Sequence, residues 1–507
     1  MSPSVPQFHL AVNVNGIPLP PEALSSLEKV YVQARLSLPA QCELTFSEPP
    51  GPLAGAALLT PGTRLRLSVA GHAADLFEGE VTVQEEFYGP AGERTLHVRA
   101  YDALHRLRKR QPVRSFVQVS LESLARELTG ELGVTLAMSG SGPTWPQVIQ
   151  HNQSDFDLLA RMAGECGLYL VLRQGRLYIQ DLSGSGPAVA LEWGKSLLEV
   201  RFSQSGEAVT RQVEVQGWNA QQGEAHTVQA GSAHPGWQGV RGVDPAQVGG
   251  VGRSLTGAIV EDDRHASALA QAELDRRAAH AVSVWGVAEG DPALQPGVPV
   301  SIQGVDRRWM GQYALVGVTH TLDARRGFQT EFTSAPPPPP AQGPAGGASV
   351  ALGEVTRVDE IPERGRVRVL LPAYGNLETG WLQVVTAGAG ENKGMIALPE
   401  PGDRVLLLLP QDDPAQGVVL GGVYAMHGAP ESKTTGNRVG CYTLLTRDGQ
   451  TIQLDDTRHA IRLEDRQGNL VDLSPEQMQI HAAVDLDIAA PGRRVTIRAA
   501  RIDFERA

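Results

Sequence analysis

Apolar and polar side chains alternate near the C-terminus in the run Met478-Gln479-Ile480-His481-Ala482-Ala483-Val484-Asp485-Leu486-Asp487-Ile488. A period of two is typical of a β-strand with one apolar face, which must be buried against another layer. The pattern recurs at Ile452/Leu454, Ile461/Leu463, Val471/Leu473, Val495/Ile497 and Ile502/Phe504, and no amphipathic helix follows to cover these residues. We therefore expect residues 436–507 to form an oligomeric β-prism or β-helix, in which several copies cover one another's apolar faces.

The composition predicts a mainly β protein with some α-helix. The 507 residues are enough for three or four domains, and Gly (56) and Pro (35) are abundant while aromatic residues make up only 5%. The net charge of −12 argues against a nucleic-acid binder, because no basic stripe offsets it. The short basic run His105–Arg110 is better interpreted as a solvated helix end than as a phosphate site.

Three cysteines lie far apart in the chain, without a CxxC pair: Cys42, Cys166 and Cys441. An odd number cannot pair fully within one chain, so we expect free thiols in a protein folded in a reducing cytoplasm. Residues 1–19 lack the basic and apolar regions of a Sec signal, and no apolar run approaches the length that spans a bilayer.

A polyproline and Gly/Ala segment at 334–349 predicts a spacer between modules. Before it, residues 1–333 are expected to form two strand-rich, barrel-like halves near 1–185 and 186–333. Helices are expected at 121–132, from Ser154 to Gly167, and at 266–279. Strands are expected at 8–14, 30–38, 64–69, 77–84, 95–100, 168–172, 176–180, 197–202, 211–216, 282–287, 298–302, 313–321 and 329–332.

After the spacer, residues 350–428 are expected to form an OB-type barrel with strands at 353–358, 366–371, 381–385, 405–409 and 418–424. OB barrels often bind oligonucleotides or sugars. Here the aromatic platform and basic groove that such binding needs are missing, so a structural barrel is the favoured interpretation.

Several stretches together resemble the spike proteins of contractile injection systems, a group that includes VgrG proteins, phage tail hubs and spikes, and spikes of extracellular phage-tail-like particles. The segment 148–163 resembles the Q-x-N-x-S-D-F-x-x-L-x-R signature of the hub, through Gln150, Asn152, Ser154, Asp155 and Phe156. Segments 101–107, 191–194 and 217–218 are also similar to hub segments, and 365–369, 402–407 and 420–421 to the spike OB domain.

The resemblance implies a homotrimeric spike with tandem hub barrels, an OB-type barrel and a C-terminal trimeric needle. It implies a hexameric tail-tube protein and baseplate proteins as partners, with a PAAR-type tip protein and possible effector cargo. Six quasi-equivalent hub units in a trimer could meet a sixfold tube ring. The trimer core of the needle would contain Ile480, Val484, Leu486, Ile488 and Ile497, and the tip-cap interface Ile502 and Phe504.

We expect no catalytic site, cofactor or metal. The sequence has no HExxH, GxSxG or Walker A motif, and Gly388–Gly394 is interpreted as a loop. Asp262-Asp263-Arg264-His265 directly precedes a helix, so capping explains its acids. His459 and His481 are single histidines expected to face solvent. The alternative function is an envelope glycan-binding or peptidoglycan-degrading protein carried on the spike.

Overall fold

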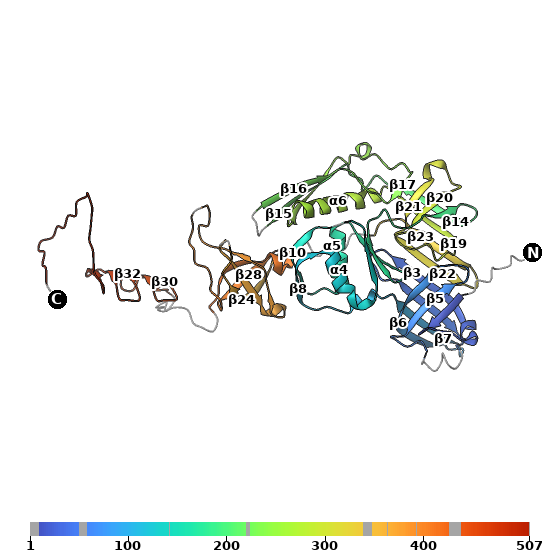
Figure 1. Cartoon of the computed structure of the whole chain (residues 1–507), viewed down its shortest axis with the longest axis horizontal. Coiled ribbons are helices and arrows are strands. Elements are labelled where there is room, and N and C mark those ends of the chain that lie inside the picture. The colour runs from blue at the N-terminus through green and yellow to red at the C-terminus, as the bar shows by residue number, and fades with distance from the viewer. Residues whose placement is uncertain are drawn as a thin grey trace, which may run out of the picture. The chain divides into compact units, whose positions relative to one another are not determined.

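The computed structural model describes residues 10–49, 58–140, 142–219, 224–337, 347–361, 364–391, 393–424 and 438–505. The chain separates into two compact units, Met1–Gly421 and Gly422–Ala507 (Figure 1). Most of the predicted spacer, residues 338–346, lies outside the described part, as do residues 425–437. None of the described helices is both long and apolar enough to span a bilayer.

One antiparallel sheet of 11 strands runs through both halves of residues 1–333, in the order β14-β19-β23-β22-β3-β4-β7-β6-β5-β1-β2. Its strands from the first half are β1 (Leu10–Val14), β2 (Ile17–Pro18), β3 (Leu27–Arg35), β4 (Gln41–Ser47), β5 (Arg64–Val69), β6 (Asp75–Tyr88) and β7 (Arg94–Tyr101). Those from the second half are β14 (Leu197–Gln204), β19 (Val282–Glu289), β22 (Gly317–Asp323) and β23 (Gly327–Thr333). The two halves of residues 1–333 join where β22 pairs with β3. They therefore share one sheet, which the sequence did not predict.

Strand β4 was missed by the sequence prediction, although it pairs with both β3 and β7. Its side chains alternate, and those of Cys42, Leu44 and Phe46 are completely buried. The period of two in this segment was the available signal.

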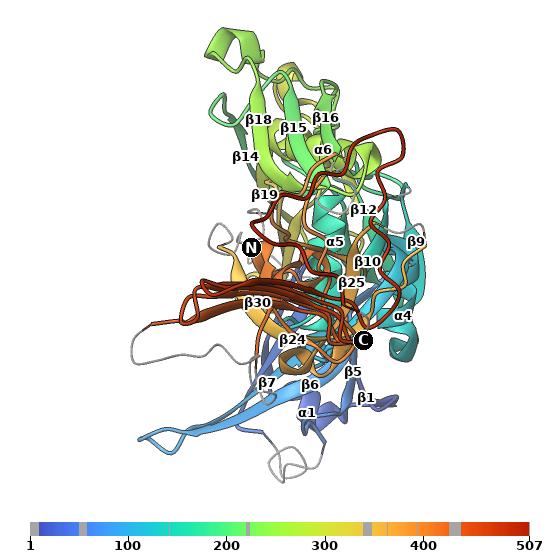
Figure 2. The same ribbon diagram turned by 90° about the vertical axis from the view of Figure 1, so that its left-hand side faces the viewer.

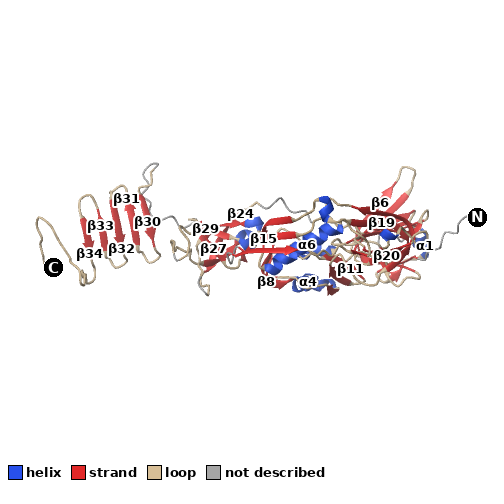
Figure 3. Ribbon diagram, turned by 90° about the horizontal axis from the view of Figure 1, so that it is seen from above, coloured by secondary structure: helices blue, strands red, loops and turns tan. Residues whose placement is uncertain are grey.

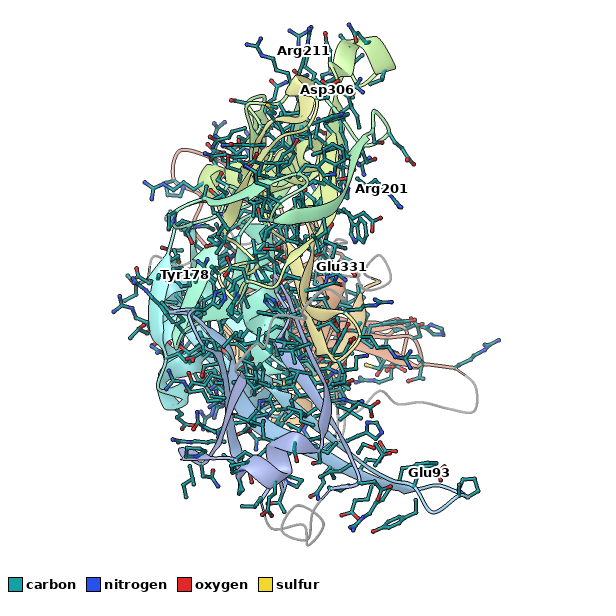
Figure 4. All side chains as sticks on the ribbon, turned by 90° about the vertical axis from the view of Figure 1, so that its right-hand side faces the viewer. Glu93, Tyr178, Arg201, Arg211, Asp306 and Glu331 are labelled. Atoms are coloured by element: carbon teal, nitrogen blue, oxygen red, sulfur yellow. The ribbon has the colours of Figure 1, made fainter. Side chains whose placement is uncertain are left out.

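The two halves keep separate cores on the inner side of the shared sheet. Leu44 and Phe46 belong to the first core, and Tyr313 and Phe332 to the second. On the outer side, the Trp285 indole in β19 donates to Glu331 of β23 (2.8 Å) and lies 5.5 Å below the Arg201 guanidinium of β14 (Figure 4). The outer side is therefore polar and suited to water.

A helical cluster follows the first half of the sheet. Helices α4 (Leu121–Thr129) and α5 (Asp155–Glu165) begin after Ser120 and Ser154, whose hydroxyls each accept a backbone N–H of the first turn. This confirms the predicted start of α5, while α4 ends three residues early and continues as a 3₁₀ turn, Gly130–Leu132. The neighbouring short elements are α3 (His105–Arg108), β8 (Arg114–Ser120), β9 (Thr135–Met138), β10 (Thr144–Gln150), β11 (Tyr169–Arg173) and β12 (Arg176–Gln180), whereas α1 (Pro21–Ser25) packs in the core of the first half of the shared sheet.

Asp155, at the start of α5, is a buried carboxylate held by three side chains. Arg114 Nη2 lies 2.6 Å from Asp155 Oδ1 and Arg110 Nε lies 3.1 Å from Oδ2. The Gln150 amide donates to Oδ1 (2.8 Å). The polar residues of the hub-like signature therefore hold the helical cluster together.

The interpretation of His105–Arg110 as a solvated helix end is confirmed only in part, because Arg106, Arg108 and Lys109 are exposed at helix α3 but the run also makes buried contacts. His105 is buried with its Nε2 atom 2.7 Å from Glu80 Oε1, and Arg106 pairs with the same carboxylate. Arg110 contacts the Asp155 carboxylate in addition. Part of the basic run therefore pairs with the carboxylates of Glu80 and Asp155 within the fold.

The second half adds two smaller sheets. One has the order β13-β20-β21-β17, from Val189–Glu192, Pro299–Gln303, Gly311–Ala314 and Trp237–Gln238. The other has the order β16-β15-β18, from Glu224–Ala230, Val213–Asn219 and Arg253–Ile259, and α6 (Asp263–Ala279) packs along it (Figure 2). Asp262 accepts from the His265 backbone N–H (2.8 Å), which confirms the capping interpretation of this stretch.

The OB-type barrel is a six-stranded sheet closed by an extra pairing of β24 with β25. Its strands are β24 (Ser349–Arg357), β25 (Arg366–Leu371), β26 (Leu377–Glu378), β27 (Leu382–Val384), β28 (Arg404–Leu409) and β29 (Val418–Gly422). All five predicted strands are present, with shifted ends.

The second unit is an antiparallel meander of five strands, which Figure 3 shows side by side. The strands are β30 (Cys441–Leu445), β31 (Thr451–Asp455), β32 (Ala460–Glu464), β33 (Leu470–Leu473) and β34 (Met478–His481). Residues 482–505 contain no assigned strand, although the sequence pattern predicts several. A strand exists only where its backbone groups pair with a neighbour, and this single chain supplies none there.

Candidate assembly surface

One face of the β30–β34 meander is entirely apolar. Directly opposed residues form one row of Tyr442, Leu454, Ile461, Leu473 and Met478, and a second row of Leu444, Ile452, Leu463, Val471 and Ile480. Directly opposed residues on antiparallel strands point to the same face, so the ten side chains form a continuous patch.

The second unit does not cover this patch. Leu444, Met478 and Ile480 are 56%, 67% and 59% exposed. Within 438–505, the buried residues are only Gly440, Cys441, Asp455 and Ala460, all at strand ends or in flanking turns. The unit therefore lacks a core of its own, and contiguous exposed apolar patches of this kind mark interaction surfaces.

The opposite face of the meander is polar along its central row, while Leu445 and Leu470 lie in a flanking row. Its central row is Thr443, Gln453, Arg462, Asp472 and Gln479. The Gln453 amide donates to the Thr443 hydroxyl (3.4 Å), and Glu464 lies 3.0 Å from Arg462, whose pKa it raises by hydrogen bonding. This difference between the two faces indicates that the face with the polar central row is the one exposed to water.

The predicted trimer-core residues fall into two groups. Ile480 lies on the apolar face of β34 opposite Val471. The other four, Val484, Leu486, Ile488 and Ile497, are exposed but lie in 482–505, outside the sheet. The predicted tip residues Ile502 and Phe504 lie in the same stretch, and Phe504 is 91% exposed.

The sequence reasoning missed Tyr442 and Leu444, the first members of the two rows. Their signal was the alternation of Tyr442 and Leu444 with Cys441 and Thr443 in β30. His481 is exposed, pairs with Leu470 and occupies the parity opposite to Ile480, as predicted.

A smaller apolar patch lies on the OB-type barrel. Val350 and Leu352 of β24 are largely exposed and pair with Leu408 and Leu406 of β28. These four side chains point outward from the barrel, because the alternate residues Ala351 and Leu407 fill its core.

The described residues include no group of three or more His, Cys, Asp or Glu side chains arranged to hold a metal ion. Within the described ranges, Cys42, Cys166 and Cys441 are free thiols. Burial raises the pKa of Cys42 far above its ordinary value and that of Cys166 to about 12, so both thiols stay protonated and unreactive at neutral pH.

Two family models match the chain. The model described as the Alg8 N-terminal domain matches residues 44–324, more than half of the sequence. The model described as the type VI secretion system/phage-baseplate injector OB domain matches residues 351–424.

Known proteins resemble the chain in sequence and in fold. The actin cross-linking toxin VgrG1 of Vibrio cholerae is 24% identical over 440 residues, which cover 76% of this chain and 37% of that protein. A chain of the Francisella PdpA–VgrG complex in its half-lidded form aligns with a TM-score of 0.56 at 8% identity, covering 94% of this chain and 88% of that one. An E. coli type VI secretion component, described as similar to the T4 tail proteins gp27 and gp5, aligns with a TM-score of 0.53 at 14% identity, covering 82% and 99%. At these identities the structural likeness establishes the fold.

Proposed function

The chain belongs to the family defined by the Alg8 N-terminal domain and is a VgrG-type spike protein, and on that premise we propose that it forms the homotrimeric central spike of a contractile injection machine. Residues 1–333 would act as the hub, 334–349 as a spacer, 350–428 as the OB barrel and 436–507 as the needle. The chain spans just over a third of the Vibrio relative, so the activity of that whole toxin is not transferred.

The observation that carries the proposal is the uncovered apolar face of β30–β34. Three copies with these faces turned inward would close a prism whose outer walls are the polar rows. Val484, Leu486, Ile488 and Ile497 would extend the same dry interior through 482–505, where unpaired backbone groups could find partners on neighbouring chains. The outward patch around Val350 and Leu352 gives the barrel an apolar surface at which copies of the chain could also contact one another.

Two copies packed face to face as a sandwich would also cover the patch, so the measured mass decides the stoichiometry. We expect light scattering on the purified chain to give three times the 54.1 kDa chain mass at micromolar concentration. A well-folded monomer would contradict the spike assignment, and a stable dimer would contradict the threefold prism.

The shared sheet of the hub supports its proposed role as a symmetry adaptor. Three chains with two similar halves each would present six quasi-equivalent units to a hexameric tail-tube protein and to the baseplate. Reconstitution with the tube protein should give one spike trimer per tube end.

We infer that the needle ends in a surface for a separate PAAR-type tip protein, formed by Ile502 and Phe504 of three chains. The Francisella complex of PdpA with VgrG supports the idea of additional protein partners, and effector cargo remains part of the proposal. The machine would supply the energy, and the spike would be assembled in the bacterial cytoplasm before it meets a target envelope.

A mechanical role without enzymatic activity follows from this assignment. The alternative, a spike-borne protein that binds envelope glycans or degrades peptidoglycan, predicts measurable release of muropeptides from purified sacculi. We expect none from the isolated trimer.

A further inference from the structure

A short segment of the OB barrel is inserted against the hub. Residues 410–417, between β28 and β29, pack their buried Ala415 with Ile149 of β10 and Leu377 of β26. This apolar contact is small, and polar side chains lie beside it.

Direct hydrogen bonds cross the junction, among them one from the Gln147 amide to the Glu378 carbonyl oxygen (3.4 Å). The Gly380 backbone N–H donates to Gln147 Oε1 (2.7 Å), and the Gln416 amide donates to Glu261 Oε1 (2.9 Å). Both join residues of the barrel to residues of the hub that are more than 150 positions away in sequence.

Behind Glu261, an ionisable network continues into helices α6 and α5. The Glu261 backbone N–H donates to His265 Nδ1 (3.4 Å), and His265 Nε2 lies 3.8 Å from Glu165 Oε2. Arg161 Nη1 lies 2.9 Å from Glu165 Oε1. The Asp262 carboxylate caps α6 beside this network.

The barrel adds carboxylates to the same place. Asp413 is half-buried, accepts from the Ala415 N–H (2.9 Å) and is influenced by the charges of Arg161, Glu165 and His151. Asp412 beside it is exposed, and its charge acts on Tyr374.

His151 approaches the junction from the end of β10. Its ring meets Tyr374 edge-on at 5.2 Å, and within the described part of the chain its Nδ1 atom is buried without a hydrogen-bond partner. Arg161 is the permanent cation of the network around Glu165, Glu261 and Asp413.

We propose that this junction is a proton-sensitive latch, which holds the OB barrel on the hub more tightly as the pH falls. Protons would neutralise Asp413 and Glu261, which reduces the excess of negative charge in the closed junction. This regulation goes beyond the mechanical role proposed above and does not depend on the oligomeric state.

The direction follows from how the closed junction changes its carboxyl groups. Burial raises the pKa of Asp413 and of Glu261 above their ordinary values. Released into water, both would return to ordinary values, so the closed state binds more protons and is disfavoured as the pH rises. Glu165 acts in the opposite direction: burial raises its pKa, but the nearby His265 and Arg161 side chains outweigh burial and lower the pKa overall.

Hydrogen exchange on the full chain tests the latch. The amides of Gly380, Ala415 and Gln416 should lose protection several-fold between pH 4 and pH 8, a range that starts at the ordinary carboxyl pKa values, after correction for the intrinsic exchange rate. Amides of β28 should keep their protection and serve as the internal control. The double variant Asp413→Asn/Glu261→Gln keeps the hydrogen-bond acceptors and should reduce the pH effect to less than twofold.

Asp359→Asn is the matched control, because Asp359 is an exposed carboxylate of the barrel that pairs with Arg357. It should retain the full pH effect. Equal protection at the two pH values in the unmodified protein would overturn the latch, as would an unchanged pH effect in the folded double variant. If the double variant loses protection in β28, the single variant Asp413→Asn replaces it, with the expectation of a partial reduction.

Discussion

The buried Asp155 carboxylate contacts three polar side chains of the helical cluster. Asp155→Ala would remove the partner of Arg110, Arg114 and Gln150 at once and leave charged and polar groups unpaired in a buried place. We expect a loss of about 3–5 kcal/mol in the free energy of unfolding, measured by urea denaturation. Glu122→Ala, which removes an exposed pair with Arg126, should cost under about 1 kcal/mol. Equal losses would show that the Asp155 network does not stabilise the fold.

Asp102 makes the stability of the hub depend on pH. Burial raises its pKa to about 7, although backbone N–H groups of Ala40 and Leu104 donate to it. A folded-state pKa above the unfolded one means a contribution that is complete below about pH 4 and is lost as the pH rises through 7. At about 1.4 kcal/mol per pKa unit, the loss is at most about 4 kcal/mol.

The measurement is the melting temperature at pH 5 and pH 8, compared with Asp102→Asn. Because the asparagine cannot ionise, the variant should be less stable at pH 5 but show a smaller drop toward pH 8. A drop as large as in the unmodified protein would assign the pH dependence to other groups.

At the scale of one strand, the adjacent residues Gln453 and Leu454 of β31 point to opposite faces of the needle sheet. Leu454→Asp places a carboxylate on the apolar face between Tyr442 and Ile461, whereas Gln453→Asp places it on the polar face between Thr443 and Arg462. In a closed trimer the first change would bury three like charges, at a cost on the order of several kcal/mol. We expect a lower melting temperature and dissociation for Leu454→Asp, and little change for Gln453→Asp.

The same contrast extends to the part of the needle without assigned strands. Leu486→Asp should disrupt the trimer and His481→Asp should be tolerated. Matching melting temperatures for these two variants would contradict the assignment of parity beyond β34.

At the scale of the whole molecule, the needle end can be separated from the rest of the assembly. Deleting residues 502–507 removes Ile502 and Phe504, and leaves β30–β34 intact. We expect the shortened protein to remain trimeric but to lose association with a PAAR-type tip protein. Undiminished capture of the tip protein by the truncated trimer would place that binding site elsewhere.

Local patterns in the sequence determined much of this protein. The alternation in 452–504 predicted an apolar face without cover, and β31 to β34 carry that face. Ser154 and the acids after it located the start of α5, because a cap depends on residues only three positions apart. Five of the six barrel strands were also predicted, since each of them is a short run bounded by turn residues.

Only the tertiary structure decided the features that depend on distant residues. The pairing of β3 with β22, the direction of His105–Arg110 toward Glu80 and Asp155, and the bonds from Gln147 and Gln416 across the junction join segments that share no local pattern. The spacing of apolar residues along a strand or helix depends on that element alone. The partner of a side chain depends on which distant segment the fold brings next to it. The sequence therefore determined which faces must be buried, and the folded chain decided which charges and which strands meet.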